Sequence, residues 1–122
     1  MATGLENFKV YGMAERLEIY VHNITKTFPA DERFRSVDQM RRSSAAVANN
    51  IAEGYARHSF QEKIRYFYIA KGEAEETKRN MLRSYKKEFL EKEIAENVAN
   101  EYTELLKAIS GYIRFLRIKK LQ

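Results

Sequence analysis

The chain has 122 residues, of which 44% are hydrophobic and 32% are charged, a composition that fits one folded helical domain over residues 1–122 and is too apolar for a disordered chain. It contains no cysteine, which excludes disulfides, thiol nucleophiles and thiolate metal sites. No apolar run approaches the roughly 20 residues of a membrane span, and the first residues lack a basic and then apolar signal pattern. The expected location is therefore the cytoplasm, without a membrane partner.

The first half of the chain predicts two helices. Apolar residues recur every three or four positions from about Leu5 to Thr27, the period that places them on one helix face. This helix ends at Phe28-Pro29, because a proline disfavours helical angles in the residue before it. The second helix covers about Phe34 to Tyr55, and Gly54 near its end is interpreted as part of a C-terminal cap.

The second half predicts two more helices. Ser59 and Glu62 match a capping box, in which each side chain binds a free backbone amide of the other residue, so the third helix begins there and runs to about Tyr85. A short connection over Lys86 to Leu90 precedes a fourth helix over about Glu91 to Lys119. The predicted inward stripe of the third helix is Phe60, Ile64, Phe67, Ala74, Met81 and Tyr85.

Short connections make consecutive helices run antiparallel, so the sequence predicts an all-α fold, an up-down-up-down four-helix bundle. The chain has more aromatic surface than one such bundle needs. Three aromatic residues in a row, 66–68, cannot share one face at about 100° per residue. Because aromatic side chains outside a core stripe are typical of interfaces, Tyr66, Tyr68, Tyr112 and Phe115 are predicted to form the interface of a homo-oligomer.

Basic residues are unevenly distributed along this chain of net charge +5. From Lys107 to the end there is no acidic residue, and Arg114, Arg117, Lys119 and Lys120 form a predicted nucleic-acid-binding surface. The structural alternative is that these cations only stabilise the negative C-terminal end of the fourth helix.

A second basic cluster consists of Arg33, Arg35, Arg41 and Arg42. Two interpretations of the adjacent pair Arg41-Arg42 stay open. In the first, both side chains contact phosphates of a nucleic acid. In the second, one points outward and the other flanks a neighbouring helix, because successive helical residues diverge by ~100°.

The sequence predicts no enzyme active site, no cofactor and no metal site. The two histidines, His22 and His58, lack the glutamate three residues earlier that di-iron bundle enzymes use. Arg16 and His22 have a spacing similar to that in one superfamily of small helical RNases, which keeps RNA cleavage as an alternative function. Asn50 and Glu53 are interpreted as hydrogen-bonding groups at the following turn rather than as a catalytic base, because no nucleophile accompanies them.

An ordered set of short motifs extends from the end of the first helix through the third. The motifs are Phe28-Pro29 with Glu32, Gln39-Met-Arg-Arg42, Asn50-Ile-Ala-Glu-Gly54, Ser59 with Glu62, and Ile69-Ala70 and Gly72 with Glu76. Together they resemble the four-helix bundle family of 23S rRNA intervening-sequence proteins. Ala46, Val47 and Glu73 depart from the residues that are frequent in that family.

The resemblance implies a bacterial protein of poorly defined biochemical role, often encoded in insertions within large-subunit rRNA genes. The family is similar to the accessory variability determinant of diversity-generating retroelements, a pentameric barrel with a basic surface that works with a reverse transcriptase. It therefore implies a homopentamer whose partner is RNA, DNA or a protein such as a reverse transcriptase. The leading interpretation is a non-enzymatic, oligomeric, nucleic-acid-binding bundle; the alternatives are a small helical RNase and a purely structural protein-assembly module.

Overall fold

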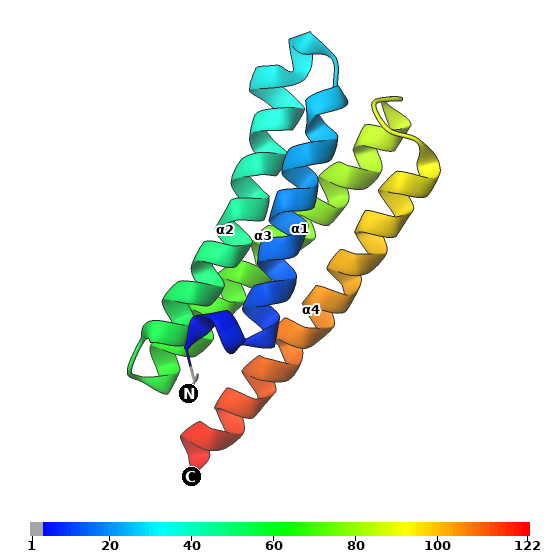
Figure 1. Ribbon diagram of the computed structural model, residues 1–122. Helices are drawn as coiled ribbons and strands as arrows, with labels where there is room; N and C mark the ends of the chain where they lie inside the picture. The colour runs from blue at the N-terminus through cyan, green and yellow to red at the C-terminus, as the bar shows by residue number, and fades with distance from the viewer. Residues whose placement is uncertain (1–3) are drawn as a thin grey trace.

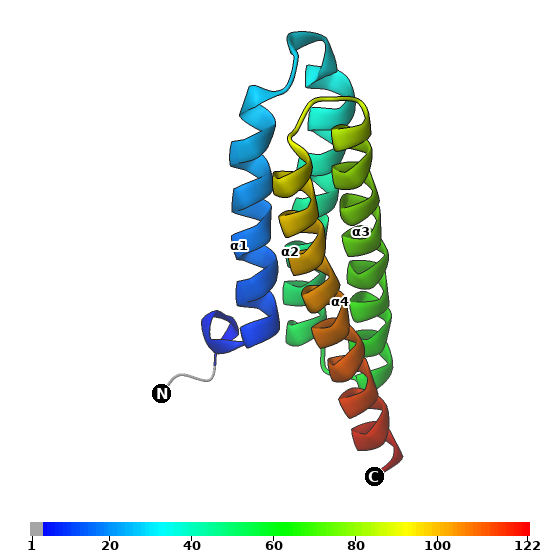
Figure 2. The ribbon, with the colours of Figure 1, turned by 90° about the vertical axis from the view of Figure 1, so that its right-hand side faces the viewer.

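A computed structural model describes residues 4–122 of the chain. Within that range it has four long helices and no strand: α1 (Lys9–Ile24), α2 (Asp38–Ala56), α3 (Phe60–Lys86) and α4 (Lys92–Leu121). The helices lie alongside one another as a bundle (Figures 1 and 2). The prediction of an all-α fold is confirmed. Of the helices described, none has an apolar stretch long enough to cross a membrane.

The connection between α1 and α2 is irregular. It contains two 3₁₀ turns, Thr25–Thr27 and Ala30–Glu32, and a π-helical turn, Arg33–Val37. Phe28 lies between the first two in an extended conformation, with φ −70° and ψ 155°, because Pro29 follows it. The predicted first helix is therefore too long, and the predicted second helix begins too early.

A separate 3₁₀ turn, Leu5–Asn7, precedes α1, and Phe8, which follows this turn, packs against the core. The Phe8 ring lies 4.8 Å from the ring of Tyr112 and 6.1 Å from that of Phe67, measured between centroids. Aromatic pairs at these separations add to the stabilisation from buried area. The N-terminal segment thus covers one end of the bundle rather than extending α1.

The core draws side chains from all four helices, and the bulkiest of those fully buried are Tyr102, Phe67 and Met40. Most of the predicted inward positions are buried or partly buried. Two are wrong: Phe60 is 38% exposed and Tyr85 is 39% exposed. Both lie in a terminal turn of α3, where a residue has fewer neighbouring turns to cover it.

The helices α2 and α3 pack closely along small polar residues. The hydroxyl oxygens of Ser43 and Thr77 are 2.7 Å apart and both residues are buried. Further along, the Ser84 hydroxyl lies 4.0 Å from the Met40 sulfur. The contacting residues are in opposite order on the two helices, so α2 and α3 run antiparallel.

Gly54 does not cap α2, contrary to the sequence prediction. The helix continues to Ala56 and ends at the extended residue Arg57. A Cβ atom at Gly54 would lie 3.0 Å from Cε2 of Phe67 and 3.0 Å from Cβ of Tyr66. The missing Cβ therefore favours the close approach of α2 to α3 and does not serve a turn.

Candidate functional site

The basic segment at the end of α4 lies at one end of the bundle. The last turns of α4 extend past the connection between α2 and α3 (Figures 1 and 2). All four predicted nucleic-acid-binding residues of this segment are exposed: Arg114, Arg117, Lys119 and Lys120. The sequence after Lys107 has no carboxylate side chain that would neutralise them. We call this segment, residues 114–121, the basic end.

The start of α3 joins the basic end to form a groove of about 390 Å³. Arg117 donates a hydrogen bond to the Tyr68 hydroxyl, and its guanidinium lies 5.3 Å from the centre of the Tyr68 ring. The residues lining the groove are Gln61 and Ile64 from α3 and Arg117, Lys120 and Leu121 from α4. Cations beside an aromatic face are the groups that bind a single-stranded nucleic acid without sequence preference.

Apolar side chains accompany the cations of the basic end. Phe115 is 48% exposed, Ile118 is 59% exposed and Leu121 is 89% exposed. The ammonium nitrogen of Lys119 lies 6.0 Å from the centre of the Phe115 ring. An exposed apolar strip on an otherwise charged helix is typical of a contact surface.

The four aromatic residues predicted to form an interface differ in exposure, although the rings of Tyr112 and Phe115 are in contact, with centroids 5.6 Å apart. Tyr68 and Phe115 are exposed. Tyr112 is half-buried and packs on Phe67, with ring centroids 4.9 Å apart. Tyr66 is also half-buried and accepts a hydrogen bond from Arg57. Contacts inside the chain therefore account for Tyr66 and Tyr112.

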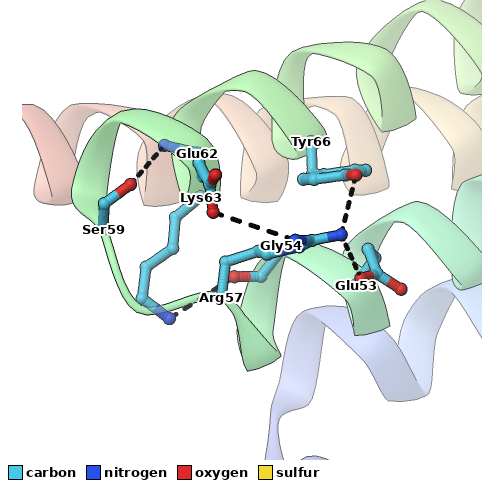
Figure 3. A network of polar contacts seen from close by, with 7 residues as sticks. All are labelled: Glu53, Gly54, Arg57, Ser59, Glu62, Lys63 and Tyr66. Carbon is cyan, nitrogen blue, oxygen red and sulfur yellow. Dashed lines mark hydrogen bonds and ion pairs between the residues drawn. The ribbon is translucent and has the colours of Figure 1, made fainter.

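Arg57 is the centre of a polar network at the turn from α2 to α3 (Figure 3). Its guanidinium lies 2.7 Å from a carboxylate oxygen of Glu53 and 3.9 Å from one of Glu62. It also donates to the Tyr66 hydroxyl at 3.0 Å and lies 4.9 Å from the centre of the Tyr66 ring. Burial lowers the pKa of Arg57, but Tyr66, Glu53 and Glu62 together outweigh it, so the pKa is raised.

Two side chains of α3 complete this turn (Figure 3). Ser59 caps α3 by accepting the backbone N–H of Glu62 at 3.1 Å. Lys63 donates to the backbone oxygen of Tyr55 at 2.8 Å and to that of Gly54 at 3.4 Å, and burial lowers the pKa of its ammonium group. The turn is thus fixed by side chains that reach across it.

The network explains Glu53 but not Asn50. The Asn50 side chain donates to the backbone oxygen of Ala46 at 2.8 Å, within its own helix, and does not reach the turn. The prediction that both residues fix the turn is therefore wrong for Asn50. The ion pair of Glu53 with Arg57 is the local role that the structure gives to its carboxylate.

Arg41 and Arg42 have different surroundings. Arg41 donates from Nε to the Thr25 hydroxyl at 2.9 Å and from Nη2 to the backbone oxygen of His22 at 3.1 Å. Arg42 is exposed and lies 3.9 Å from a carboxylate oxygen of Asp38. Of the two open interpretations, the geometry fits the second: one arginine holds the end of α1, and the other faces solvent.

Other residues that carried the family resemblance line a groove of about 350 Å³ between α2 and α3. Its lining residues are Gln39, Arg42, Ser43, Ala46, Glu73 and Glu76. Burial, with the nearby carboxylate of Glu76, raises the pKa of Glu73. Gly72 lies beside this groove in α3 with no atom within 4 Å of where a Cβ would be. Two of the three departures from the family, Ala46 and Glu73, therefore line the same groove as Gln39 and Glu76, whereas the third, Val47, is buried.

The three residues considered for the alternative chemistries, Arg16, His22 and His58, are all exposed. Arg16 and His22 are exposed on α1 and are separated by six residues, about 9 Å along the helix axis. His58 is exposed in the turn before α3. Within residues 4–122, no three or more acidic, histidine or cysteine side chains come close enough to hold a metal ion.

Comparisons with known proteins agree with this architecture. The family model described as 23S rRNA-intervening sequence protein matches residues 6–111. None of the curated proteins matches the chain. The crystal structure of a protein of unknown function from the S23 ribosomal protein family of Bacteroides thetaiotaomicron VPI-5482, at 1.70 Å, superposes with a TM-score of 0.82. That protein is 23% identical, and the match covers 90% of this chain and 99% of the other. On the family match, this chain belongs to the 23S rRNA-intervening sequence protein family.

Proposed function

We propose that this protein is a non-enzymatic bundle that binds nucleic acid, RNA in the first place, through its basic end. The observation that carries the proposal is the groove in which Arg117 and Lys120 of α4 meet the start of α3 beside the Tyr68 ring. Phosphates are neutralised by the cations, while the exposed ring of Tyr68 offers a face on which a base stacks. The residues that line the groove come from α3 and α4 rather than from a loop, so binding is expected to be insensitive to sequence.

Replacing Arg114, Arg117, Lys119 and Lys120 together with glutamine tests this proposal. We expect the dependence of log Kd on log salt to become flatter by about 3, because each phosphate contact on a single strand contributes about 0.7. Between about 50 and 200 mM salt, the wild type should therefore lose about 50-fold more affinity than the variant. Fluorescence anisotropy with a labelled single-stranded RNA measures both slopes.

A charge-matched control separates the place of the charges from their number. The control replaces four exposed cations in the second half of α3 or at its connection to α4 with glutamine, which changes the net charge of +5 by the same four units: Arg79, Lys86, Lys87 and Lys92. This control should keep the wild-type slope. Equal losses in the two variants, or no salt-dependent binding by the wild type, would contradict the proposal.

We also propose that the up-down-up-down bundle self-associates, with the homopentamer implied by the family resemblance as the expected state. The exposed strip of Phe115, Ile118 and Leu121 supports this, because a monomer gains nothing from presenting it to water. Light scattering should give a mass near five times the 14.4 kDa of one chain. A mass near 14.4 kDa at micromolar concentration would exclude self-association, and another multiple would correct the pentamer.

A further inference from the structure

A second concave site lies at the opposite end of the bundle from the basic end, where α1 connects to α2 (Figure 1). It is a pocket of about 330 Å³, within the size range of small-molecule sites. Its walls come from the two 3₁₀ turns and the π-helical turn that join the helices. The lining residues are Thr25, Lys26, Phe28, Pro29, Ala30, Arg33, Val37 and Arg41.

Three cations line this pocket and no carboxylate does. Lys26, Arg33 and Arg41 make no ion pair with an acidic group among residues 4–122, whereas Arg42 and Arg57 of the same chain do. Unpaired positive charges in a concave site with apolar walls concentrate the electrostatic potential there. The pocket is therefore suited to an anion of more than one negative charge.

Arg41 is held in place before any ligand arrives. The Thr25 hydroxyl accepts from Arg41 Nε at 2.9 Å and itself donates to the backbone oxygen of Val21 at 2.8 Å. A second hydrogen bond joins Arg41 Nη2 to the backbone oxygen of His22 at 3.1 Å. These bonds use two of the five guanidinium N–H donors, and the other three have no partner among the described residues. A fixed guanidinium with free donors matches the geometry of a phosphate.

The apolar part of the pocket is equally rigid. Phe28 is only 8% exposed and packs against Phe89, with ring centroids 5.4 Å apart. Pro29, between the two 3₁₀ turns, and Val37, the last residue of the π-helical turn, line the same wall. The site therefore combines a fixed apolar surface with an unbalanced cluster of cations.

From this combination we infer that the pocket binds a phosphomonoester whose organic part rests on Phe28 and Pro29, with a 5′-nucleotide as the fitting ligand. A phosphomonoester carries −1.5 to −2 charge at neutral pH, which three unpaired cations balance better than the single charge of a phosphodiester. The nucleotide has two sources with the same chemistry, a free nucleoside monophosphate and the 5′-phosphorylated end of a strand. This site is separate from the basic end and does not depend on it.

Titration of ¹⁵N-labelled protein with AMP and with adenosine tests the assignment. AMP should shift the amide resonances of residues 25–41, while adenosine, which lacks the phosphate, should leave them in place. Replacing Lys26 and Arg33 together with glutamine should weaken AMP binding about tenfold or more, the effect of losing charged hydrogen bonds. Both side chains are exposed, so the double variant retains the core.

The control variant Lys86→Gln/Lys92→Gln removes the same charge from exposed sites outside the pocket and should bind AMP like the wild type. The fourfold glutamine variant of the basic end should also bind AMP normally, so failure of the proposed function leaves this result intact.

A second experiment identifies the source of the nucleotide. In the fourfold glutamine variant, binding of a 5′-phosphorylated oligonucleotide is compared with binding of its 5′-hydroxyl form. Preference for the phosphorylated strand over AMP identifies the strand end as the source, and equal binding identifies the nucleotide. If adenosine shifts the same amides equally, if neither phosphorylated ligand shifts them, or if the Lys26/Arg33 variant binds unchanged, the inference is overturned.

Discussion

Tyr102→Ala is expected to lower the free energy of unfolding by about 3–5 kcal/mol, whereas Tyr102→Phe is expected to raise it by about 1 kcal/mol. Tyr102 is only 1% exposed, and its hydroxyl is a buried group without a hydrogen-bond partner in the part of the chain that the structure describes. Burial, with the Glu18 charge nearby, raises the pKa of Tyr102, so the hydroxyl stays protonated. The ring stabilises the core while the hydroxyl opposes burial.

Denaturant titration of the two Tyr102 variants separates the ring from the hydroxyl. The phenylalanine variant keeps the ring volume and removes only the polar atom, so its unfolding midpoint should move to higher denaturant, and in a separate thermal scan its melting temperature should rise by about 4 °C. The alanine variant leaves a cavity that the surrounding helices fill only in part. If Tyr102→Phe is destabilised by 1 kcal/mol or more, the hydroxyl makes a favourable interaction in solution and this account of its burial fails.

Phe67→Ala is expected to cost about 3–5 kcal/mol, and its effect should be coupled to that of Gly54→Ala. Phe67 is fully buried and sets the limit on what fits at Gly54. Alanine at Gly54 gains about 1 kcal/mol of helix propensity but overpacks the contact by about 1–3 kcal/mol, so the single variant should lose about 1 kcal/mol. In the double variant the ring is gone and part of that overpacking disappears.

A double-mutant cycle measures this coupling. The variant with both substitutions should be about 1 kcal/mol more stable than the sum of the single effects predicts. Gly72→Ala is the matched control, because it also replaces a glycine inside a helix but has no atom within 4 Å of the added Cβ. It should raise stability by up to about 1 kcal/mol. A destabilised Gly72→Ala variant, or strictly additive effects of the Gly54 and Phe67 changes, would refute the packing argument.

The helices could be predicted from the sequence, because apolar residues that recur every three or four positions share one face only in an α-helix. It did not distinguish the two roles of a glycine near a helix end. A C-terminal cap and a close helix contact both favour the missing Cβ, and only the position of the Phe67 ring shows that Gly54 serves the second role. The exposure of Phe60 and Tyr85 could not be predicted either, because periodicity does not indicate how far a neighbouring helix extends.

The candidate sites were partly predictable for a related reason. The count of charges identified the cations of α4, because four of them lie within seven residues and no acidic residue follows Lys107. It missed Tyr68 and Gln61, which meet them only once α3 packs beside α4. In the same way, Lys26 belongs to no basic run in the sequence, and it joins Arg33 and Arg41 only through the irregular connection between α1 and α2.

The turn from α2 to α3 also affects how the bundle opens. Lys63 of α3 holds the final carbonyl oxygens of α2, so the last turn of one helix is bonded to the first turn of the next. Helix ends normally fray independently, with opening free energies near zero. Here the end of α2 cannot unwind without breaking the first turn of α3, and Arg57 adds the Glu53 and Tyr66 contacts to the same step. We therefore expect the end of α2 and the start of α3 to open together, so that slow hydrogen exchange extends through the turn.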